Sequence, residues 1–281
     1  MTQRPVAFVT GASRGIGAST AVALAQAGYD VAITARTVRE GEGKRWGEDG
    51  DREIAGSLET VAAAIERAGT RPFSIAMDLV DRDSVIAAAD TTLEEFGRVD
   101  VVCNIGIYQG PGSGLFLDTP VDLFARHFEG DVIAPFLLLQ KLVPVMIGQG
   151  GGTIVNMSSY VVLNDPPGTA NENGWSLGYA VSKAGIDRFS GVLNAELGSQ
   201  GIVAYTVDPG FVTYGADFDD TVARYPGMPV SPPEASSAGI VWLVTSPDAK
   251  RLIHKHIFLP DLTHRNGLLP GWGGPGTPFP G

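Results

Sequence analysis

The sequence predicts an α/β protein: a doubly wound parallel sheet of about seven strands with helices on both faces. Short runs rich in β-branched residues alternate along the chain with longer runs of helical period. The short runs are apolar throughout, as in strands that helices cover on both faces. No composition break or internal repeat marks a second domain, so residues 1–266 form one domain, followed by a Gly/Pro-rich tail, 267–281.

Each expected strand is a short apolar run, and each expected helix is a longer stretch of helical period. Right-handed crossovers then wind the chain into the parallel sheet. The expected strands are Val6–Thr10, Val31–Thr34, Arg71–Met77, Val99–Asn104, Thr153–Met157, Ile202–Val207 and Leu252–Leu259. The expected helices are Ile16–Ala27, Ile54–Ala68, Ser84–Phe96, Val121–Ile147, Tyr179–Gly198 and Pro233–Thr245.

Composition excludes several classes of protein. Of the 281 residues, 44% are apolar and only 18% charged, so the chain can bury a large core and is not disordered throughout. A net charge of −11 repels phosphate backbones, which argues against a nucleic-acid partner. The single Cys103 excludes an internal disulfide and a Cys-based zinc site, and it favours a reducing compartment.

No segment has the pattern of a targeting signal or a membrane span. The first residues lead directly into the apolar run Val6–Val9, with no small-residue cleavage site after it. The longest apolar stretch, Val132–Ile147, is interrupted by Gln140, Lys141 and Pro144 and is too short to span a bilayer. We therefore expect a soluble, cytoplasmic protein with no membrane partner.

Three segments depart from compact packing. Thr37–Ser57 is dense in charge and is expected to be a solvated loop, and Asn164–Gly178 is rich in Pro, Gly and Asn. The tail holds six Gly and four Pro in its fifteen residues, which excludes regular secondary structure. It is either a frayed end, or a segment that packs Trp272 and Phe279 over a cleft or a neighbouring subunit.

A glycine-rich turn, TGASRGIG at positions 10–17, lies between the first strand and the first helix. Gly11 permits a tight turn, Gly15 lets backbone approach a pyrophosphate, and Gly17 allows close contact between helix and strand. The helix start then offers free N–H groups and a positive dipole end to an anion. In this position the turn indicates a dinucleotide site rather than an ordinary tight turn.

The residues after the second strand favour NADP(H) over NAD(H). A ribose 2′-hydroxyl is usually held by an acid at this point, but here the strand ends in Arg36. Arg36 and Arg14 together match a 2′-phosphate, unless both are ordinary surface arginines. Asp78, after the third strand, is either an adenine contact or a helix N-terminal acid.

Five motifs in order resemble the short-chain dehydrogenase/reductase family, in its single-domain branch with TGxxxGIG and YxxxK motifs. The motifs are the glycine turn, CNIG at 103–106, NMSS at 156–159, YAVSK at 179–183 and DPG at 208–210. The resemblance extends from about Val6 to Leu259, and it implies the doubly wound (Rossmann) fold. It places the cofactor on Gly11, Ser13, Arg14, Gly15, Ile16, Gly17, Arg36, Asp78, Leu79, Asn104, Gly106, Tyr179, Lys183, Pro209, Gly210 and Val212.

Tyr179 and Lys183 stand four residues apart and so share one face of a helix. Carbonyl reduction needs an acid that protonates the nascent alkoxide. A nearby ammonium lowers the pKa of a phenol toward the pH at which the enzyme works. In the resembled family the tyrosine is the acid/base, the lysine lowers its pKa and holds the nicotinamide ribose, and a serine orients the substrate oxygen. By position that serine is Ser159, with Ser158 as its rival.

The chain departs from the family pattern at several positions. The twenty residues from Ser159 to Tyr179 are more than usual, which indicates an enlarged loop at the substrate mouth. The family's fourth catalytic residue, an asparagine that supports a water relay, corresponds here to Asp131. Asp131 either serves that relay, or faces solvent or caps nearby backbone. After Gly210 the usual threonine is displaced, with Thr213 one residue early and Tyr214 in its place.

The leading hypothesis is an NADP(H)-dependent oxidoreductase that interconverts a secondary alcohol and a ketone or aldehyde, with hydride chemistry supplied by the cofactor. NAD(H) preference is one alternative. Two others are a non-redox relative, as in halohydrin dehalogenases, and a non-catalytic nucleotide-binding relative. Intact Gly15, Gly17 and Lys183 argue against the non-redox form, and retained Ser159 and Tyr179 against the non-catalytic form.

The loop at 211–233, the extra loop and the tail are expected to line the substrate pocket with Trp175, Tyr214, Phe218, Tyr225, Met228 and Trp272. Such a lining suits a medium-sized apolar alcohol or ketone better than a sugar phosphate. The family's usual interface helices, here Val121–Ile147 and Tyr179–Gly198, predict a homodimer or homotetramer. No metal site is expected, because His254 and His256 are interpreted as one polar face of the last strand. His127 and Cys103 are interpreted as packing residues.

Overall fold

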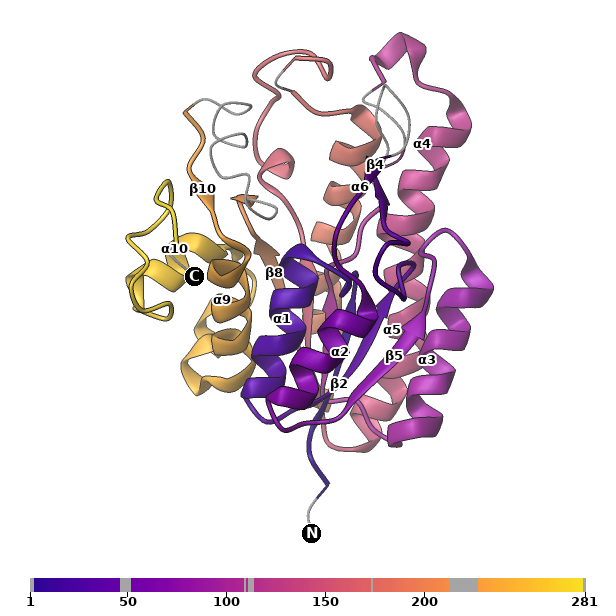
Figure 1. Cartoon of the computed structure of the whole chain (residues 1–281), viewed down its shortest axis with the longest axis vertical. Coiled ribbons are helices and arrows are strands. Elements are labelled where there is room, and N and C mark those ends of the chain that lie inside the picture. Colours follow the sequence, from indigo (N-terminus) through magenta and orange to yellow (C-terminus); the bar gives the residue numbers. More distant parts are fainter. Residues whose placement is uncertain are drawn as a thin grey trace.

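The computed structural model describes residues 3–45, 52–108, 110, 114–172, 174–212 and 227–279. Its centre is a parallel sheet of seven strands in the order β11-β8-β7-β6-β1-β2-β5, which confirms the predicted fold class (Figure 1). The strands are β1 Val6–Thr10, β2 Asp30–Ala35, β5 Pro72–Ala76, β6 Val101–Asn104, β7 Gly152–Met157, β8 Ile202–Asp208 and β11 His256–Phe258.

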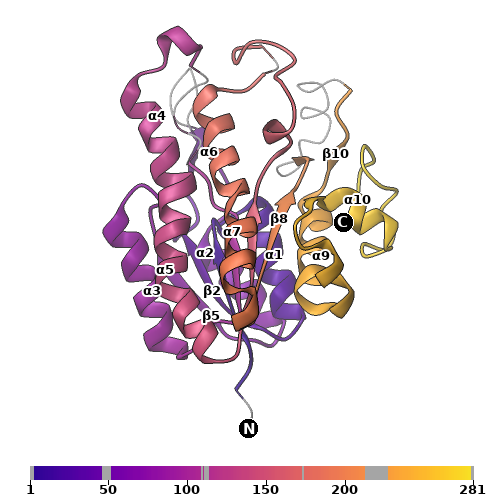
Figure 2. The same ribbon diagram turned by 180° about the vertical axis from the view of Figure 1, so that it is seen from behind.

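Helices cover both faces of this sheet, as Figures 1 and 2 show from opposite sides. One face carries α1 Gly15–Gln26, α2 Leu58–Arg67 and α9 Pro233–Thr245. The other carries α3 Arg82–Phe96, α4 Val121–Phe128, α5 Ala134–Gly148, α6 Leu177–Asp187 and α7 Phe189–Leu197. Burial on both faces explains why the strands are apolar throughout: every side chain of β1 is buried.

The direction of winding reverses between β1 and β6. From β1 the chain moves outward to β2 and β5, then returns to place β6 on the other side of β1. In such sheets a crevice opens outside the carboxyl ends of the strands at this switch point, and ligands bind there. The glycine turn follows β1, and the CNIG segment forms the end of β6 and the residues after it, so the topology brings both to one crevice.

The long predicted helix Val121–Ile147 is continuous, but it contains a π-helical turn, Glu129–Ile133, between α4 and α5. Gly130 has no side chain there, and a Cβ at this position would lie 2.6 Å from the Cβ of Tyr108. At 28 residues, Val121–Gly148 is long and apolar enough to span a membrane, yet half of its most apolar part is buried inside the fold. Leu138, Leu142 and Met146 pack against the sheet, so α5 serves as a core helix.

Two predicted helix boundaries differ for local reasons. The helix expected from Ile54 begins at Leu58, because Ser57 caps it by accepting from the backbone N–H of Thr60. The helix expected at Tyr179–Gly198 begins at Leu177 and is divided at Arg188 into α6 and α7.

The charged segment expected to be a solvated loop is more ordered than that. Lys44–Arg45 and Arg52–Glu53 form a short antiparallel pair, β3 and β4. The Glu40 carboxylate accepts from the backbone N–H of Gly56 and from the Thr60 hydroxyl. The part of this segment that the structure describes therefore folds back over the start of α2.

The predicted strand Leu252–Leu259 shortens to His256–Phe258. Ser246 caps a 3-10 turn, Pro247–Leu252, and His254 has a φ of +66°, which breaks extended geometry. After β11 the chain forms an unpredicted helix, α10 Leu259–Arg265.

The tail packs rather than frays over its described part. Trp272 is buried, lies edge-on to His264 with ring centroids 6.2 Å apart, and donates its indole N–H to the carbonyl of Thr277. The Gly276 N–H donates to the carbonyl of Val230 at 2.9 Å. Val230–Ser231 is β10, which pairs with β9, Phe211–Val212. The tail thus holds β10 through the carbonyl of Val230.

Candidate active site

The glycine turn requires glycine for the reasons its spacing predicts. Gly11 and Gly15 have φ values of +67° and +57°, in the left-handed region that favours glycine. A Cβ at Gly11 would lie 2.6 Å from the Cα of Gly106, and one at Gly17 would lie 2.2 Å from the carbonyl oxygen of Gly11. The turn therefore directs the N-terminus of α1 into the crevice between β1 and β6, where an anion is favoured.

Thr10 joins this turn to the segment after β6. Its hydroxyl oxygen accepts from the backbone N–H groups of Ile105 and Gly106, both at 2.9 Å. The Asn104 amide N–H donates to Oδ1 of Asn156 at 2.8 Å, whereas its own Oδ1 is buried with no hydrogen-bond partner in the described residues. An unpaired buried acceptor is the kind of group that a bound ligand or water satisfies. This edge of the crevice therefore fits a nucleotide cofactor.

The two arginines proposed for a 2′-phosphate lie in different environments. Arg14 donates to the carbonyls of Ala55 and Gly56 and to the Thr37 hydroxyl, so it ties the charged segment to the start of α1. Burial lowers the pKa of the Arg14 guanidinium, the carboxylate of Glu40 raises it, and the nearby Arg36 cation lowers it. Arg36 is exposed at the end of β2. Within the described residues it has no hydrogen bond or ion pair.

Asp78 and Leu79, two of the predicted cofactor contacts, lie after β5. Asp78 accepts from the Val80 N–H, and its own N–H donates to the Ser84 hydroxyl. The acid that caps α3 is Asp81, not Asp78, so the alternative of a helix-capping role for Asp78 is wrong. The Leu79 side chain packs against Gly106, where a Cβ would lie 3.2 Å from its Cδ1.

Helix α6 holds Tyr179 and Lys183 one turn apart. Ser176 caps this helix by accepting from the Tyr179 N–H. Tyr179 is half-buried, whereas Lys183 is buried and donates from Nζ to the carbonyl of Met157 at 2.8 Å. Burial lowers the pKa of the Lys183 ammonium, and the carboxylates of Asp131 and Asp208 raise it.

The end of β7 separates the two candidate serines. The Ser158 hydroxyl is buried and donates to Oδ1 of Asp187 at 2.8 Å. Ser159 is half-buried, and its side chain does not cap the 3-10 turn Tyr160–Val162 that follows. Ser158 is therefore committed to the interior, and Ser159 is the serine that remains for a substrate.

Asp131 lies in the π-helical turn and is buried, so the interpretation that it faces solvent is wrong. Its Oδ1 accepts from the Tyr108 N–H and its Oδ2 from the Ser182 hydroxyl, both at 2.7 Å. The alternative that Asp131 caps nearby backbone is confirmed at the Tyr108 N–H. The same carboxylate raises the pKa of Lys183, so it is also within electrostatic reach of that ammonium.

His127 packs beside this group, as predicted for a packing residue. Its ring stands edge-on to Tyr108 with centroids 5.4 Å apart, and its Nδ1 lies 3.7 Å from Oδ2 of Asp131. A Cβ at Gly178, the residue before Tyr179, would lie 2.5 Å from the imidazole. The enlarged loop and the helix that carries Tyr179 are therefore supported by α4.

An aromatic group borders the site beside Ser159. The Tyr160 ring lies edge-on to Trp175 at 6.3 Å and tilted to Phe211 at 6.1 Å, measured between centroids. Trp175 belongs to the extra loop, so that loop does contribute to this border. Trp272 instead packs on α10, and Thr213, Tyr214, Phe218 and Tyr225 lie outside the described residues.

The segment after β8 turns at Pro209 and Gly210. Gly210 has a φ of +67°, and its N–H donates to Oδ1 of Asp208 at 2.8 Å. A Cβ at Gly210 would lie 2.8 Å from the ring of Phe258 on β11. Val212, the last predicted cofactor contact, is buried in β9.

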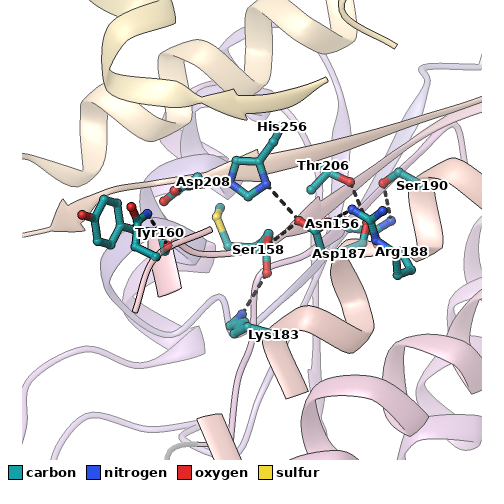
Figure 3. Close-up of polar contacts among 12 residues, drawn as sticks. Asn156, Ser158, Tyr160, Lys183, Asp187, Arg188, Ser190, Thr206, Asp208 and His256 are labelled. Atoms are coloured by element: carbon teal, nitrogen blue, oxygen red, sulfur yellow. Dashed lines mark hydrogen bonds and ion pairs between the residues drawn. The ribbon is translucent and has the colours of Figure 1, made fainter. Parts of the chain in front are cut away.

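Sequence reasoning missed a buried cluster of charges beneath the site. His256 on β11 approaches Oδ1 of Asp187 with Nδ1, at 2.9 Å, and Oδ2 of Asp208 with Nε2, at 3.4 Å (Figure 3). Asp187 also pairs with Arg188. One signal was present in the sequence: Asp187 follows Lys183 by four residues and therefore shares its helix face.

The remaining candidates behave as packing groups. Cys103 is fully buried, and burial raises the pKa of its thiol to about 12, so it is unreactive. Among the described residues no cluster of three His, Cys, Asp or Glu side chains could hold a metal ion.

Known proteins resemble this chain in sequence and in fold. A family profile described as enoyl-(acyl carrier protein) reductase matches residues 11–223. The 3-oxoacyl-(acyl-carrier-protein) reductase FabG of Staphylococcus aureus is 32% identical over 225 residues, which cover 77% of each chain.

Solved structures share the fold over almost the whole chain. A short-chain type dehydrogenase/reductase from Mycobacterium marinum superposes with a TM-score of 0.73 at 27% identity, covering 90% of this chain and 93% of that one. A short-chain dehydrogenase from Mycobacterium paratuberculosis, bound to NAD, has a TM-score of 0.72 at 22% identity, covering 90% and 95%.

Proposed function

Because the chain belongs to the short-chain dehydrogenase/reductase family, whose members are nicotinamide-dependent oxidoreductases acting on carbonyl and alcohol groups, we propose a specific reaction. The protein interconverts a secondary alcohol and a ketone or aldehyde with NADP(H). The observation that carries the proposal is the buried Lys183 ammonium one helical turn from Tyr179, with Ser159 at the end of the neighbouring strand β7.

When bound, the cofactor supplies or accepts the hydride. The chain's own residues handle the proton and the substrate oxygen. In the reducing direction the Tyr179 hydroxyl donates its proton to that oxygen, and in the oxidising direction the phenolate accepts it. Ser159 holds the same oxygen by a hydrogen bond, and the Lys183 cation stabilises the phenolate. The carboxylates of Asp131 and Asp208 raise the pKa of Lys183 and so oppose the lowering effect of its burial.

The cofactor would lie across the crevice between β1 and β6. Gly11 to Gly17 and the start of α1 would hold the pyrophosphate, with Ser13, Arg14 and Ile16 among the contacts. Asp78 and Leu79 would border the adenine, and Asn104, Gly106, Pro209, Gly210 and Val212 would border the nicotinamide half. Lys183 and Tyr179 would also meet the nicotinamide ribose.

Preference for NADP(H) rests on Arg36. It is exposed at the end of β2, and its guanidinium has no partner among the described residues, so all its donors are available for a phosphate. Arg14 has a supporting role, because three of its bonds already hold the charged segment in place.

The test is a titration of NADPH and NADH by fluorescence against the wild type, Arg36→Ala, Arg39→Ala and Tyr179→Phe. Arg39 is the matched control, being an exposed arginine on the same segment. We expect NADPH to bind at least about tenfold more tightly than NADH, a preference worth about 1.4 kcal/mol. Arg36→Ala should abolish it, Arg39→Ala should retain it, and Tyr179→Phe should bind cofactor without turnover.

Other results would select the alternatives. Equal or tighter NADH binding would indicate an NAD(H) enzyme. Failure of both nucleotides to bind would indicate a non-redox relative. Cofactor binding with no turnover across a broad panel of ketones and alcohols would indicate a non-catalytic relative.

For the substrate, the Tyr160, Trp175 and Phe211 group supports a medium-sized apolar ketone or alcohol. A second candidate is a 3-oxoacyl thioester, because the similar Staphylococcus aureus protein is a 3-oxoacyl-(acyl-carrier-protein) reductase. A panel of aryl ketones, aliphatic ketones and a 3-oxoacyl thioester, compared by kcat/KM, distinguishes the two. Trp175→Ala should raise KM most for the largest ring.

The protein is proposed to act as a homodimer or homotetramer in the cytoplasm, with neither nucleic acid nor membrane as a partner. Phe136 on α5 and Val192 on α7 support self-association, because both are large apolar side chains that are about half exposed, at 48% and 53%. Light scattering that gives only a 29.4 kDa species would contradict the oligomer.

A further inference from the structure

The buried charge cluster connects three elements that the proposed mechanism uses or adjoins. Asp187 lies at the end of α6, Asp208 at the end of β8, and His256 on the edge strand β11 (Figure 3). Both carboxylates are almost completely buried, and the imidazole lies between them. A buried charge needs a partner, so these three groups depend on one another.

The geometry favours a protonated imidazole. A neutral imidazole has one N–H, whereas His256 faces a carboxylate oxygen with each ring nitrogen. Only the imidazolium can donate to both. In agreement, hydrogen bonds from Asp187 and Asp208 raise the pKa of His256 to about 9, against an opposing effect of burial.

Asp187 is held as a carboxylate by the same cluster. Burial raises the pKa of its carboxyl, but hydrogen bonds from His256, Arg188 and Ser158 overcome this and lower it to about 2. The groups that face His256 are therefore Asp187 and Asp208, with Lys183 of α6 close to Asp208 and Arg188 on the far side of Asp187.

Each carboxylate is hydrogen-bonded to a segment of the candidate active site. Asp187 accepts from Ser158, the neighbour of Ser159. Asp208 accepts from the Gly210 N–H. Phe258, which follows His256 by two residues on β11, packs against Gly210. Strand β11 thus supports both the serine end of β7 and the turn after β8.

We propose that His256, as an imidazolium, is a positioning residue for the reaction: through Asp187 it sets the Ser158–Ser159 end of β7, and through Asp208 it sets the Pro209–Gly210 turn. The inference rests on the proposed function for its catalytic consequence, but its geometric part does not. When His256 loses its proton, one of the two carboxylates faces a nitrogen lone pair, and that half of the support is lost.

Two substitutions separate the halves. In His256→Asn the amide nitrogen replaces Nδ1 and keeps the Asp187 contact, whereas in His256→Gln it replaces Nε2 and keeps the Asp208 contact. The matched control is His254→Asn, because His254 is exposed and has a φ of +66°, where Asn is well tolerated.

We expect His256→Asn chiefly to weaken NADPH binding, because the Gly210 turn is released, and His256→Gln chiefly to lower kcat, because Ser159 is released. A displacement of about 1 Å at a reacting group can cost about 100-fold in rate, so a loss of about 10- to 100-fold is expected for the affected parameter. His254→Asn should match the wild type in both.

The decisive readout is independent of turnover. Histidine ring signals followed by NMR from pH 6 to 10.5 should show His256 titrating near pH 9, and the wild-type Kd for NADPH should rise over the same range. In His256→Asn the Kd should already be high and no longer change there.

Titration of His256 near 6.5, or variants that bind NADPH and turn over like His254→Asn, would overturn the proposal. If Tyr179→Phe retained activity while His256 titrated near pH 9, the proposed mechanism would fail and the positioning role in cofactor binding would stand. The two failures are therefore distinguishable.

Discussion

The Ser158 hydroxyl donates a hydrogen bond to the Asp187 carboxylate at 2.8 Å inside the protein, while Ser159 lies at the edge of the site. Two adjacent serines therefore lie in different environments, and we expect their alanine variants to fail in different ways. Ser158→Ala removes one of the donors that stabilise a buried carboxylate, so it should cost about 1–3 kcal/mol in the free energy of unfolding. Ser159→Ala should leave stability nearly unchanged and lower kcat by at least about 100-fold. Urea unfolding and steady-state kinetics on both variants check this, and reversed phenotypes would make Ser158 the catalytic serine.

Asp131→Asn should fold normally and shift the pH profile. Asn can accept from the Tyr108 N–H and donate to the Ser182 oxygen, and the Ser182 hydroxyl can then donate to the carbonyl of Tyr179, 3.0 Å away. Loss of the carboxylate removes a charge that raises the pKa of Lys183, so this pKa falls further below its usual range. Activity that needs the Lys183 cation should then be lost at lower pH than in the wild type. An unchanged alkaline limb of the kcat profile would show that Asp131 does not act on Lys183.

Gly17→Ala tests the close packing of the glycine turn. Its Cβ would lie 2.2 Å from the backbone oxygen of Gly11, which cannot move away as a flexible side chain could. We expect a loss of about 3 kcal/mol in stability and little cofactor binding. Gly148→Ala is the control, because nothing lies within 4 Å of its Cβ at the end of α5, and it should be neutral or stabilising by up to about 1 kcal/mol. Equal stability of the two variants would contradict the role assigned to Gly17.

Much of the fold follows from the sequence because burial on both faces of the sheet gives each strand an unmistakable apolar run, and α9 matches its predicted bounds, Pro233–Thr245. The proximity of Tyr179 and Lys183 is predictable from the sequence as well, because helical spacing places them on one face. The His256 cluster was not visible, because its partners stand 69 and 48 residues away and meet only when β11 pairs with β8. Strand alternation predicts which face of the sheet a histidine occupies. It does not predict which carboxylates of other elements lie on that face.

The charged segment and the tail show a second limit. Composition indicates correctly that neither forms a long regular element, but it does not reveal single anchoring contacts. Arg14 and Glu40 hold the first segment, and Trp272 holds the tail. These contacts depend on the positions of backbone carbonyls and N–H groups, which composition does not encode.

The tail anchor gives a prediction for Trp272→Ala. This substitution removes a buried ring and its bond to the Thr277 carbonyl, so stability should fall by about 2–4 kcal/mol. The Gly276 N–H should lose its bond to the Val230 carbonyl as the tail loosens. Hydrogen exchange should be faster at the Gly276 N–H, with exchange in β1 as the unchanged control. Wild-type exchange and stability in the variant would instead support the frayed tail.

Stability should depend on pH through the same cluster that positions the site. The pKa of Asp187 lies below its ordinary value of 3.8, so its contribution is present above about pH 4 and is lost as the pH falls toward 2. The pKa of His256 lies above its ordinary value of 6.5, so its contribution is complete below that pH and is lost as the pH rises through about 9. Urea midpoints measured from pH 3 to 10 should therefore form a plateau between about 4 and 6.5. His256→Gln should flatten the alkaline side, because the imidazolium whose proton is lost there is gone, and the acidic side should persist through Ser158 and Arg188. An alkaline decline that survives in His256→Gln would place its origin outside this cluster.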